Sequence, residues 1–293
     1  MRVSYNPKKN SFFPSNRNSI LPQVMWHITD RCKLNCKMCF AKNRTAFPHN
    51  IDENTVEDSL SLLSQLEVQK IDISGGEPLL CPSFTFIVNH AVAHNFHLTV
   101  TTRGLGYSNN IDWLLKNWKL FSRIIVSIDC FDRISNDSYV DCQGAFDSLL
   151  NFVTELAILQ SDNLRINTVV NRTILENKKL IKMCELIQSI MPKEWCIIQP
   201  HPLNKRDTFD DYSVNSIEYN KFVINVTSEM RDIKNLTILT RPNTTYSTYW
   251  CLYPDNTIAR LSQNSEYSFQ CLLCKSNLEL IKQEVNSSTH VLP

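Results

Sequence analysis

The chain has 293 residues, 43% of them hydrophobic, and its 30 basic and 29 acidic side chains leave a formal net charge of +1. This length suffices for one large domain, with or without an appendage. The near-neutral charge excludes a global attraction to a nucleic-acid polymer or an anionic membrane, and no run of 18 apolar residues predicts a membrane span.

Residues 1–20 come first and are rich in Asn, Lys, Ser and Pro. They lack the apolar core of a signal peptide and the amphipathic face of a membrane-surface helix. We therefore expect a short polar tail and a cytoplasmic protein.

Short apolar stretches then alternate with longer amphipathic ones. Strands are predicted at residues 24–29, 70–74, 97–102, 123–129, 165–170 and 195–199. Helices are predicted at residues 53–66, 84–94, 111–117, 146–159 and 175–190, the first with Asp52 as its N-cap. Beyond residue 200 the alternation is lost, and only a helix at 220–230 and a strand at 249–253 are predicted.

This alternation predicts an α/β fold with a parallel sheet, and its length fits a partial (βα)6 TIM-like barrel. We assign residues 21–200 to the barrel and residues 201–293 to a C-terminal extension that closes the substrate site. The active site of such a fold lies at the C-terminal ends of the strands. Ser127, Asn167 and the loops after the first two strands occupy such ends.

Among 11 cysteines, only Cys32, Cys36 and Cys39 are closely spaced, as C-x3-C-x2-C in one loop. Three thiolates suit an iron–sulfur cluster or zinc. A four-iron cluster with three cysteine ligands leaves one iron open to another molecule. Zinc needs a fourth ligand, and the local candidates His27 and His49 lack zinc-finger spacing. Zinc with a distant fourth ligand, or three buried cysteines, are the alternatives.

A turn with the sequence Gly75–Gly76–Glu77–Pro78 follows the second predicted strand. Gly75 and Gly76 let backbone approach a ligand closely, and the Glu77 carboxylate can pair with an ammonium group. Taken by itself, this sequence is typical of an ordinary loop. Because it comes one strand–helix unit after the cysteine loop, it indicates a ligand site.

With Phe40 directly after the third cysteine, the loop resembles that of the radical S-adenosylmethionine (SAM) superfamily. The resemblance implies a [4Fe-4S] cluster on Cys32, Cys36 and Cys39, whose open iron binds the amino and carboxylate groups of S-adenosyl-L-methionine. It also implies that the Gly–Gly–Glu turn holds the methionine ammonium and that the barrel is of the radical SAM type.

The chain resembles the viperin family over about residues 22–285. The most specific similarity lies at residues 165–172. Further similar segments are residues 26–29, 74–78, 195–199, 249–255 and 277–280. The resemblance implies a lyase that converts a nucleoside triphosphate to its 3′-deoxy-3′,4′-didehydro form in antiviral, here anti-phage, defence. In that reaction the 5′-deoxyadenosyl radical takes H4′ and the 3′-hydroxyl leaves.

The same resemblance implies roles for single residues. Lys70 and Arg165 stand where the family binds phosphate, and Tyr249 matches a tyrosine near the substrate. Ser127 and Asn167 match positions that contact SAM or the substrate ribose. Alternatively, Tyr249 packs in the core, and Ser127 and Asn167 cap the ends of strands. A flavodoxin or ferredoxin is the expected electron donor.

Three positions depart from the family. Cys196 replaces a lysine, and Glu194 and Asp141 each replace an arginine. A triphosphate carries about four charges, which need partners when desolvated. Either other cations take over, or the substrate is less charged, such as a monophosphate or a nucleoside. The candidate replacement cations are Arg172, Lys205, Arg206 and Arg241.

Cys251, Cys271 and Cys274 permit a second interpretation, an auxiliary cluster of the kind found in peptide-modifying radical SAM enzymes. The leucine-rich surroundings also fit ordinary packing. The remaining cysteines that we expect to be replaceable without loss of the cluster are Cys81, Cys130, Cys142 and Cys184.

Overall fold

The computed structural model describes residues 21, 23–41, 49–159, 162–203, 206–243, 249–261 and 267–289. The predicted tail at residues 1–20 and the candidate cation Lys205 lie outside these described residues.

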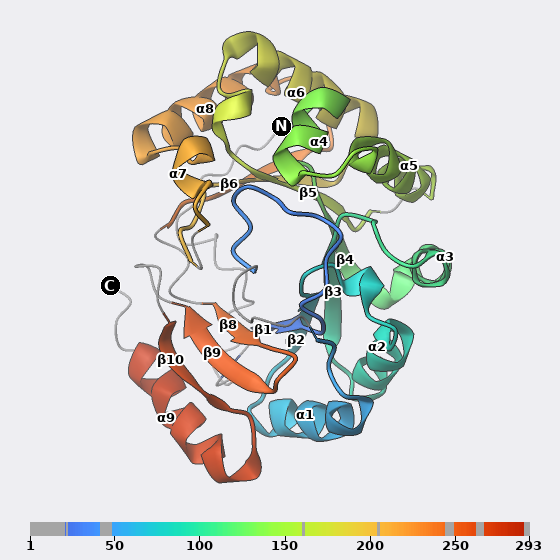
Figure 1. Ribbon diagram of the computed structural model, residues 1–293, viewed down its shortest axis with the longest axis vertical. Coiled ribbons are helices and arrows are strands. Elements are labelled where there is room, and N and C mark those ends of the chain that lie inside the picture. Colours follow the sequence, from blue (N-terminus) through green and yellow to red (C-terminus); the bar gives the residue numbers. More distant parts are fainter. Residues whose placement is uncertain are drawn as a thin grey trace.

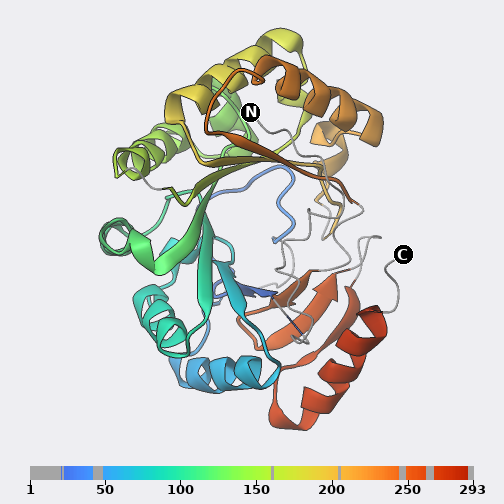
Figure 2. The same cartoon turned by 180° about the vertical axis from the view of Figure 1, so that it is seen from behind.

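The strands of the described chain form one curved sheet in the order β10-β9-β8-β1-β2-β3-β4-β5-β6-β7. Their bounds are β1 Gln23–His27, β2 Lys70–Ser74, β3 His97–Thr102, β4 Phe121–Ser127, β5 Leu164–Val169, β6 Glu194–Ile198, β7 Thr237–Arg241, β8 Trp250–Leu252, β9 Thr257–Leu261 and β10 Tyr267–Leu272. Neighbouring strands from β8 through β1 to β7 are parallel. Strand β9 pairs antiparallel with both β8 and β10. The sheet curls around an interior, with the helices outside (Figure 1; Figure 2).

Most of the helices cover the convex face of this sheet. The helices are α1 Glu53–Gln65, α2 Phe84–Ala93, α3 Ser108–Lys116, α4 Arg133–Val140, α5 Ala145–Ile158, α6 Asn177–Ile190, α7 Phe209–Tyr212, α8 Ser216–Glu229 and α9 Leu278–Thr289. Of these, α4 and α7 pack against the cysteine loop instead. The Asp52 side chain accepts a hydrogen bond from the Asn54 backbone at 3.0 Å, which confirms the predicted N-cap of α1. No helix in the described part of the chain is both long and apolar enough to cross a membrane.

The parallel α/β architecture is confirmed, and every strand and helix predicted before residue 200 is present with small shifts at its ends. The alternation runs one unit further than predicted, because α8 leads into β7, which pairs parallel with β6. The pattern was missed because β7, with the sequence TILTR, offers few apolar residues. The functional division of the chain at residue 200 stays a prediction.

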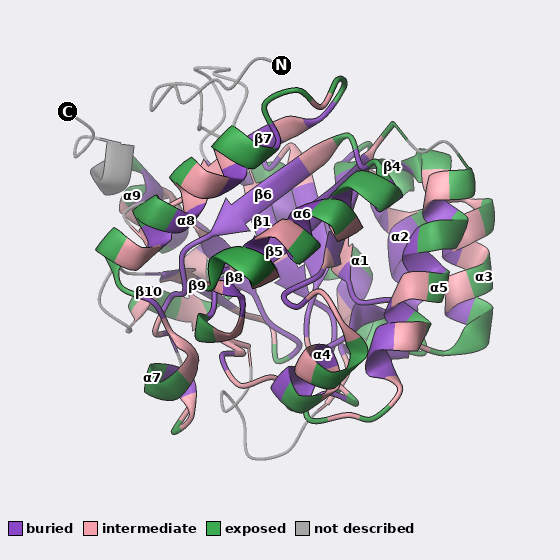
Figure 3. Ribbon diagram, turned by 90° about the horizontal axis from the view of Figure 1, so that it is seen from above, coloured by how far each residue is buried: buried purple, intermediate pink, exposed green. Residues whose placement is uncertain are grey.

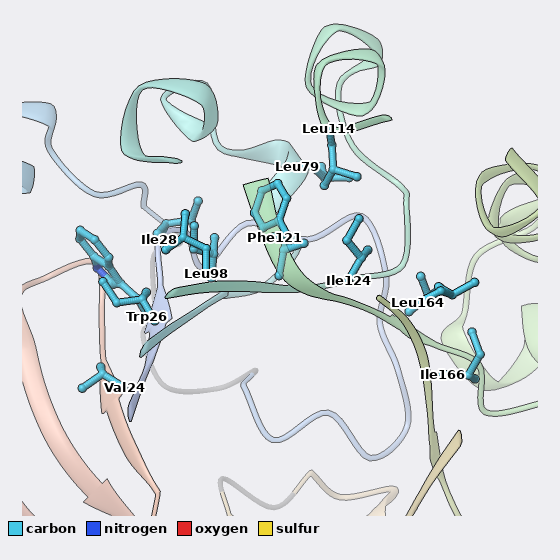
Figure 4. Close-up of a cluster of buried hydrophobic side chains, with 14 of the residues drawn as sticks. Val24, Trp26, Ile28, Leu79, Leu98, Leu114, Phe121, Ile124, Leu164 and Ile166 are labelled. Carbon is cyan, nitrogen blue, oxygen red and sulfur yellow. The ribbon is translucent and has the colours of Figure 1, made fainter. Parts of the chain in front are cut away.

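Strand register separates an apolar outer face from a polar inner face. Leu98, Ile124, Leu164 and Ile166 are buried between the sheet and the helices (Figure 4). Colouring by burial shows that the strands are mostly buried, whereas the helices carry both buried and exposed residues (Figure 3). Because side chains alternate along a strand, the residues between these apolar positions face the interior. The predicted site residues that lie on strands share that inner face: Lys70, Ser127, Arg165 and Asn167.

Candidate active site

The cysteine loop follows β1 and crosses the interior of the curved sheet (Figure 1). Two backbone hydrogen bonds hold it on α4: the Asn35 N–H donates to the Val140 carbonyl at 2.8 Å, and the Lys37 N–H donates to the Tyr139 carbonyl at 3.1 Å. On its other side, the Arg206 guanidinium donates to the Cys36 carbonyl at 3.1 Å. The loop is therefore braced by segments before β5 and after β6.

The Gly75–Gly76 turn packs against the backbone that leads into the cysteine loop. Gly75 has a φ of +146°, and a Cβ there would lie 2.3 Å from the Thr29 carbonyl oxygen. A Cβ on Gly76 would lie 2.3 Å from the Arg31 carbonyl oxygen. Both glycines are thus required by the close approach of two backbone segments.

Seven predicted site residues line one cavity of about 180 Å³. They are Cys32, Cys36, Cys39, Gly75, Gly76, Glu77 and Ser127. No three His, Cys, Asp or Glu side chains among the described residues close around a single metal ion. The three thiols instead share the wall of a cavity, which fits a cluster in which each cysteine binds a different iron.

The histidines considered as a fourth zinc ligand have other neighbours. The His27 ring packs 5.0 Å from the Tyr253 ring and 6.0 Å from the Phe40 ring, measured between centroids. His49 Nδ1 lies 3.5 Å from an Asp30 carboxylate oxygen. These contacts favour the cluster over the zinc alternative.

The Glu77 carboxylate is buried and already accepts several hydrogen bonds. It receives the backbone N–H groups of Arg103 at 2.9 Å and Leu79 at 3.2 Å, and the Thr102 hydroxyl. Burial raises the pKa of Glu77, while these donors oppose the rise. A carboxylate can accept about four hydrogen bonds, so one further donor, such as an ammonium group, can still be accommodated.

A buried ion pair between Arg103 and Asp129 was not predicted. The Arg103 guanidinium bonds to Asp129, whose other oxygen accepts the Val169 N–H at 2.8 Å. Both side chains line the cavity, and Arg103 is the one cation among its described lining residues. Burial raises the pKa of the Cys36 thiol to about 12, and Arg103 opposes that rise. Their positions just beyond β3 and β4 were the signal that could have identified them.

Lys70 and Arg165 lie on the inner face of the sheet, outside the lining of this cavity. Arg165 is fully buried, and its Nε donates to the Asn167 side-chain oxygen at 2.9 Å. Burial lowers the pKa of Lys70 to about 8, and the nearby cations Arg123 and Arg165 lower it further. The carboxylates Asp72 and Glu194 oppose this shift, so Lys70 and Arg165 share one charged region of both signs.

Tyr249 and Arg241 extend this region. The Arg241 guanidinium lies 5.1 Å from the centre of the Tyr249 ring, a cation–π contact. Burial raises the pKa of Tyr249. Of the other candidate cations, Arg172 pairs with Glu218 on the surface, and Arg206 contacts the cysteine loop. Arg241 is thus the described candidate that joins the interior group.

The three departures from the family pattern have different surroundings. Glu194 binds Arg123 through two contacts of 2.8 and 2.9 Å. Cys196 is fully buried next to Asn167 in the sheet register. Asp141 ends α4 and accepts a hydrogen bond from the Asn35 side chain at 2.9 Å. This contact places it at the cysteine loop, and its grouping with the phosphate site stays a prediction.

The auxiliary-cluster interpretation is contradicted by strand register. Cys251 pairs with Ala259, whereas Cys271 pairs with Ile258, the preceding residue of β9. Adjacent residues of a strand point to opposite faces, so Cys251 and Cys271 project to opposite sides of the sheet. Cys251 lies in an interior apolar cluster, and Cys271 packs against the outer core. They cannot bind one cluster in this fold.

Comparison with known proteins agrees with this geometry. Residues 26–141 match the model of the radical SAM superfamily. An S-adenosylmethionine-dependent nucleotide dehydratase from Flammeovirga pacifica is 27% identical over 86% of this chain and 86% of its own length. A protein of the same name from Fibrobacter sp. (strain UWH6) is 30% identical, covering 67% of this chain and 61% of the relative.

Solved structures show the same fold. SuiB from Streptococcus suis, bound to its precursor peptide SuiA, superposes with a TM-score of 0.73 at 14% identity, over 94% of this chain and 67% of SuiB. anSMEcpe with bound AdoMet superposes with a TM-score of 0.65 at 14% identity, over 83% of this chain and 75% of that one. At this identity the likeness shows the fold alone.

Proposed function

We propose that this chain, whose residues 26–141 match the radical SAM superfamily, is a nucleotide dehydratase that converts a nucleoside triphosphate to its 3′-deoxy-3′,4′-didehydro form. The names of its relatives support this reaction class. The observation that carries the proposal is the group of cations on the inner sheet face, next to the cavity that the cysteines line.

We assign different residues of the cavity to the cluster and to SAM. Cys32, Cys36 and Cys39 would hold a [4Fe-4S] cluster, and the Gly75–Glu77 turn with Ser127 would hold SAM. When bound, these groups supply a carbon radical that can remove hydrogen from an unactivated C–H bond. Leu34, Met38 and Phe40 give this cavity apolar walls, which exclude water from a reactive site.

The order of polar residues along the inner face indicates how the substrate would be oriented. Asn167 follows Arg165 by two residues on one face of β5, about 7 Å along the strand. We assign Asn167 to the ribose and Arg165 to a phosphate, with Lys70 and Arg241 as further phosphate partners. The ribose then faces the cysteine loop, and Tyr249, beside Arg241, borders the substrate.

We also assign the protein an electron donor of the flavodoxin or ferredoxin type, a place in the cytoplasm and a role in defence against phage. Each turnover needs one electron for SAM cleavage and a second to complete the loss of the 3′-hydroxyl, with a proton, as water. A small one-electron carrier meets this need.

The test is an anaerobic incubation of the reconstituted protein with SAM, a reductant and each nucleotide in turn. Mass spectrometry should detect 5′-deoxyadenosine and a product lighter than the substrate by one water. Cys36→Ala, which removes a cluster ligand, is the matched negative control. Formation of 5′-deoxyadenosine without any altered nucleotide, across all nucleotides tested, would reject the dehydratase.

A further inference from the structure

We infer that Arg123 is a phosphate-binding residue of the nucleotide site and that Glu194 serves to hold its guanidinium in place. This inference rests on the proposed function and adds a residue to it. Arg123 offsets the negative charge that Glu194 brings in place of the family's arginine.

The contact between the two residues spans a strand. Arg123 on β4 reaches across β5 to Glu194 on β6, with Nε 2.8 Å from one carboxylate oxygen and Nη2 2.9 Å from the other. Arg165, on the intervening strand, lies 4.0 Å from the same carboxylate. The three side chains form one charged group on the inner face of the sheet.

Exposure differs within this group. The Arg165 side chain is 0% exposed, whereas those of Arg123 and Glu194 are 25% and 20% exposed. Of the two arginines, Arg123 is therefore the more accessible to an entering anion. Glu194 engages Nε and Nη2, which leaves further N–H donors of the five in a guanidinium for a phosphate.

Charge explains why the pair belongs to a binding site. A lone Glu194 carboxylate among phosphate groups would repel them, and burial would magnify the repulsion. One hydrogen bond and a second close charge contact with Arg123 offset the carboxylate's charge and restrict the guanidinium, which reduces the entropy cost of binding an anion. Lys70 lies on the same inner face, and its pKa is lowered first by burial and then by Arg123, while Asp72 and Glu194 oppose the shift.

Position along the strand indicates which part of the substrate Arg123 meets. Arg123 precedes Ser127 by four residues on the same face of β4, about 13 Å along the strand. Ser127 lines the cysteine cavity. An anion at Arg123 is thus remote from the reacting ribose, so the outer phosphates of a polyphosphate chain are the groups it fits.

Arg123 and Glu194 could instead only brace β4 against β6, and three variants separate the two roles. Arg123→Gln removes the cation, Glu194→Gln keeps an acceptor for Arg123, and the Arg123→Glu/Glu194→Arg double variant reverses the pair. For each, calorimetry on cluster-loaded, SAM-bound protein would measure affinity for the preferred triphosphate and its monophosphate, beside the unfolding temperature.

Phosphate binding predicts that Arg123→Gln weakens the triphosphate at least about tenfold and the monophosphate much less. Glu194→Gln should change either affinity by less than about threefold, and the reversed pair should recover most of the triphosphate affinity. A pure brace predicts lower unfolding temperatures for the single variants with unchanged affinities, and that result would overturn the inference. A wild-type protein that binds no nucleotide would instead reject the proposed function.

Discussion

Gly76 donates its backbone N–H to the Thr29 carbonyl at 2.7 Å, and this bond fixes the turn after β2 to the chain that enters the cysteine loop. Glu77 adds a second bond, from its N–H to the Arg31 carbonyl at 2.8 Å. The Gly–Gly–Glu turn therefore shapes the loop that carries the three cysteines, in addition to its proposed contact with SAM. A change in the turn should be visible in iron binding before any nucleotide is added.

Gly76→Ala should lower the iron content of the reconstituted protein, because the new Cβ would meet the Arg31 carbonyl oxygen at 2.3 Å and displace the loop. Iron per chain and the visible absorption of the cluster are the measurements. Gly144→Ala is the control: its φ of +77° disfavours alanine, but no atom lies within 4 Å of its Cβ. A full complement of iron in Gly76→Ala would show that the loop tolerates the shift.

Replacement of Cys32, Cys36 or Cys39 by alanine should abolish cluster assembly, because each is expected to ligate one iron. Cys184→Ala is the matched change outside the site: Cys184 is buried on α6 in the outer core. It should keep the iron and lose only packing stability. Normal SAM cleavage by any of the three loop variants would refute the ligand assignment.

Arg103→Met should destabilise the protein by about 3–5 kcal/mol, because it leaves the Asp129 carboxylate buried without its cation. Chemical denaturation of the cluster-free protein measures this. The Arg103→Met/Asp129→Asn double variant should regain much of the loss, since an amide keeps the acceptor for the Val169 N–H. Equal losses in the single and double variants would mean that the charge pair is not the source of the effect.

Nucleotide affinity should fall as the pH rises through about 8, where free Lys70 loses its proton. A phosphate favours protonated Lys70, so the bound form has the higher pKa and binding is strongest below pH 8. Titrations between pH 7 and 9.5 measure the effect. Lys70→Arg should remove this dependence, because a guanidinium stays charged throughout the range. A wild-type profile that matches that of Lys70→Arg would place Lys70 outside the phosphate site.

Local sequence predicted the first six strands because each is a short apolar run bounded by turn residues. The cysteine loop and the glycine turn were equally legible, since their residues are adjacent in sequence. β7, β9 and β10 were missed. Of these, β7 and β10 are edge strands, which need fewer apolar residues: β10 alternates half-buried and exposed positions. These strands are defined by their pairing with neighbouring strands, which local sequence patterns do not reveal.

Arg123 shows where sequence reasoning ends. A single charge within the run FSRIIVS is usually a solvated position, yet register turns it inward. Its partner Glu194 lies two strands away, so no local spacing connects them. Asp141 shows a different limit. It stands at a position that sequence similarity matches to a phosphate-site arginine, but its side chain contacts Asn35 in the cysteine loop.

The pairing of β8 with β1 sets the order in which this site can be completed. Cys251 lies beside Met25 in parallel register, and the cluster of Cys251, Tyr253 and Leu261 packs around Phe40. One wall behind the cysteine loop is therefore made of residues translated long after the loop itself. We expect a nascent or truncated chain that lacks β8 and β9 to leave Met25 and Phe40 uncovered, which makes iron loading a late, post-translational step.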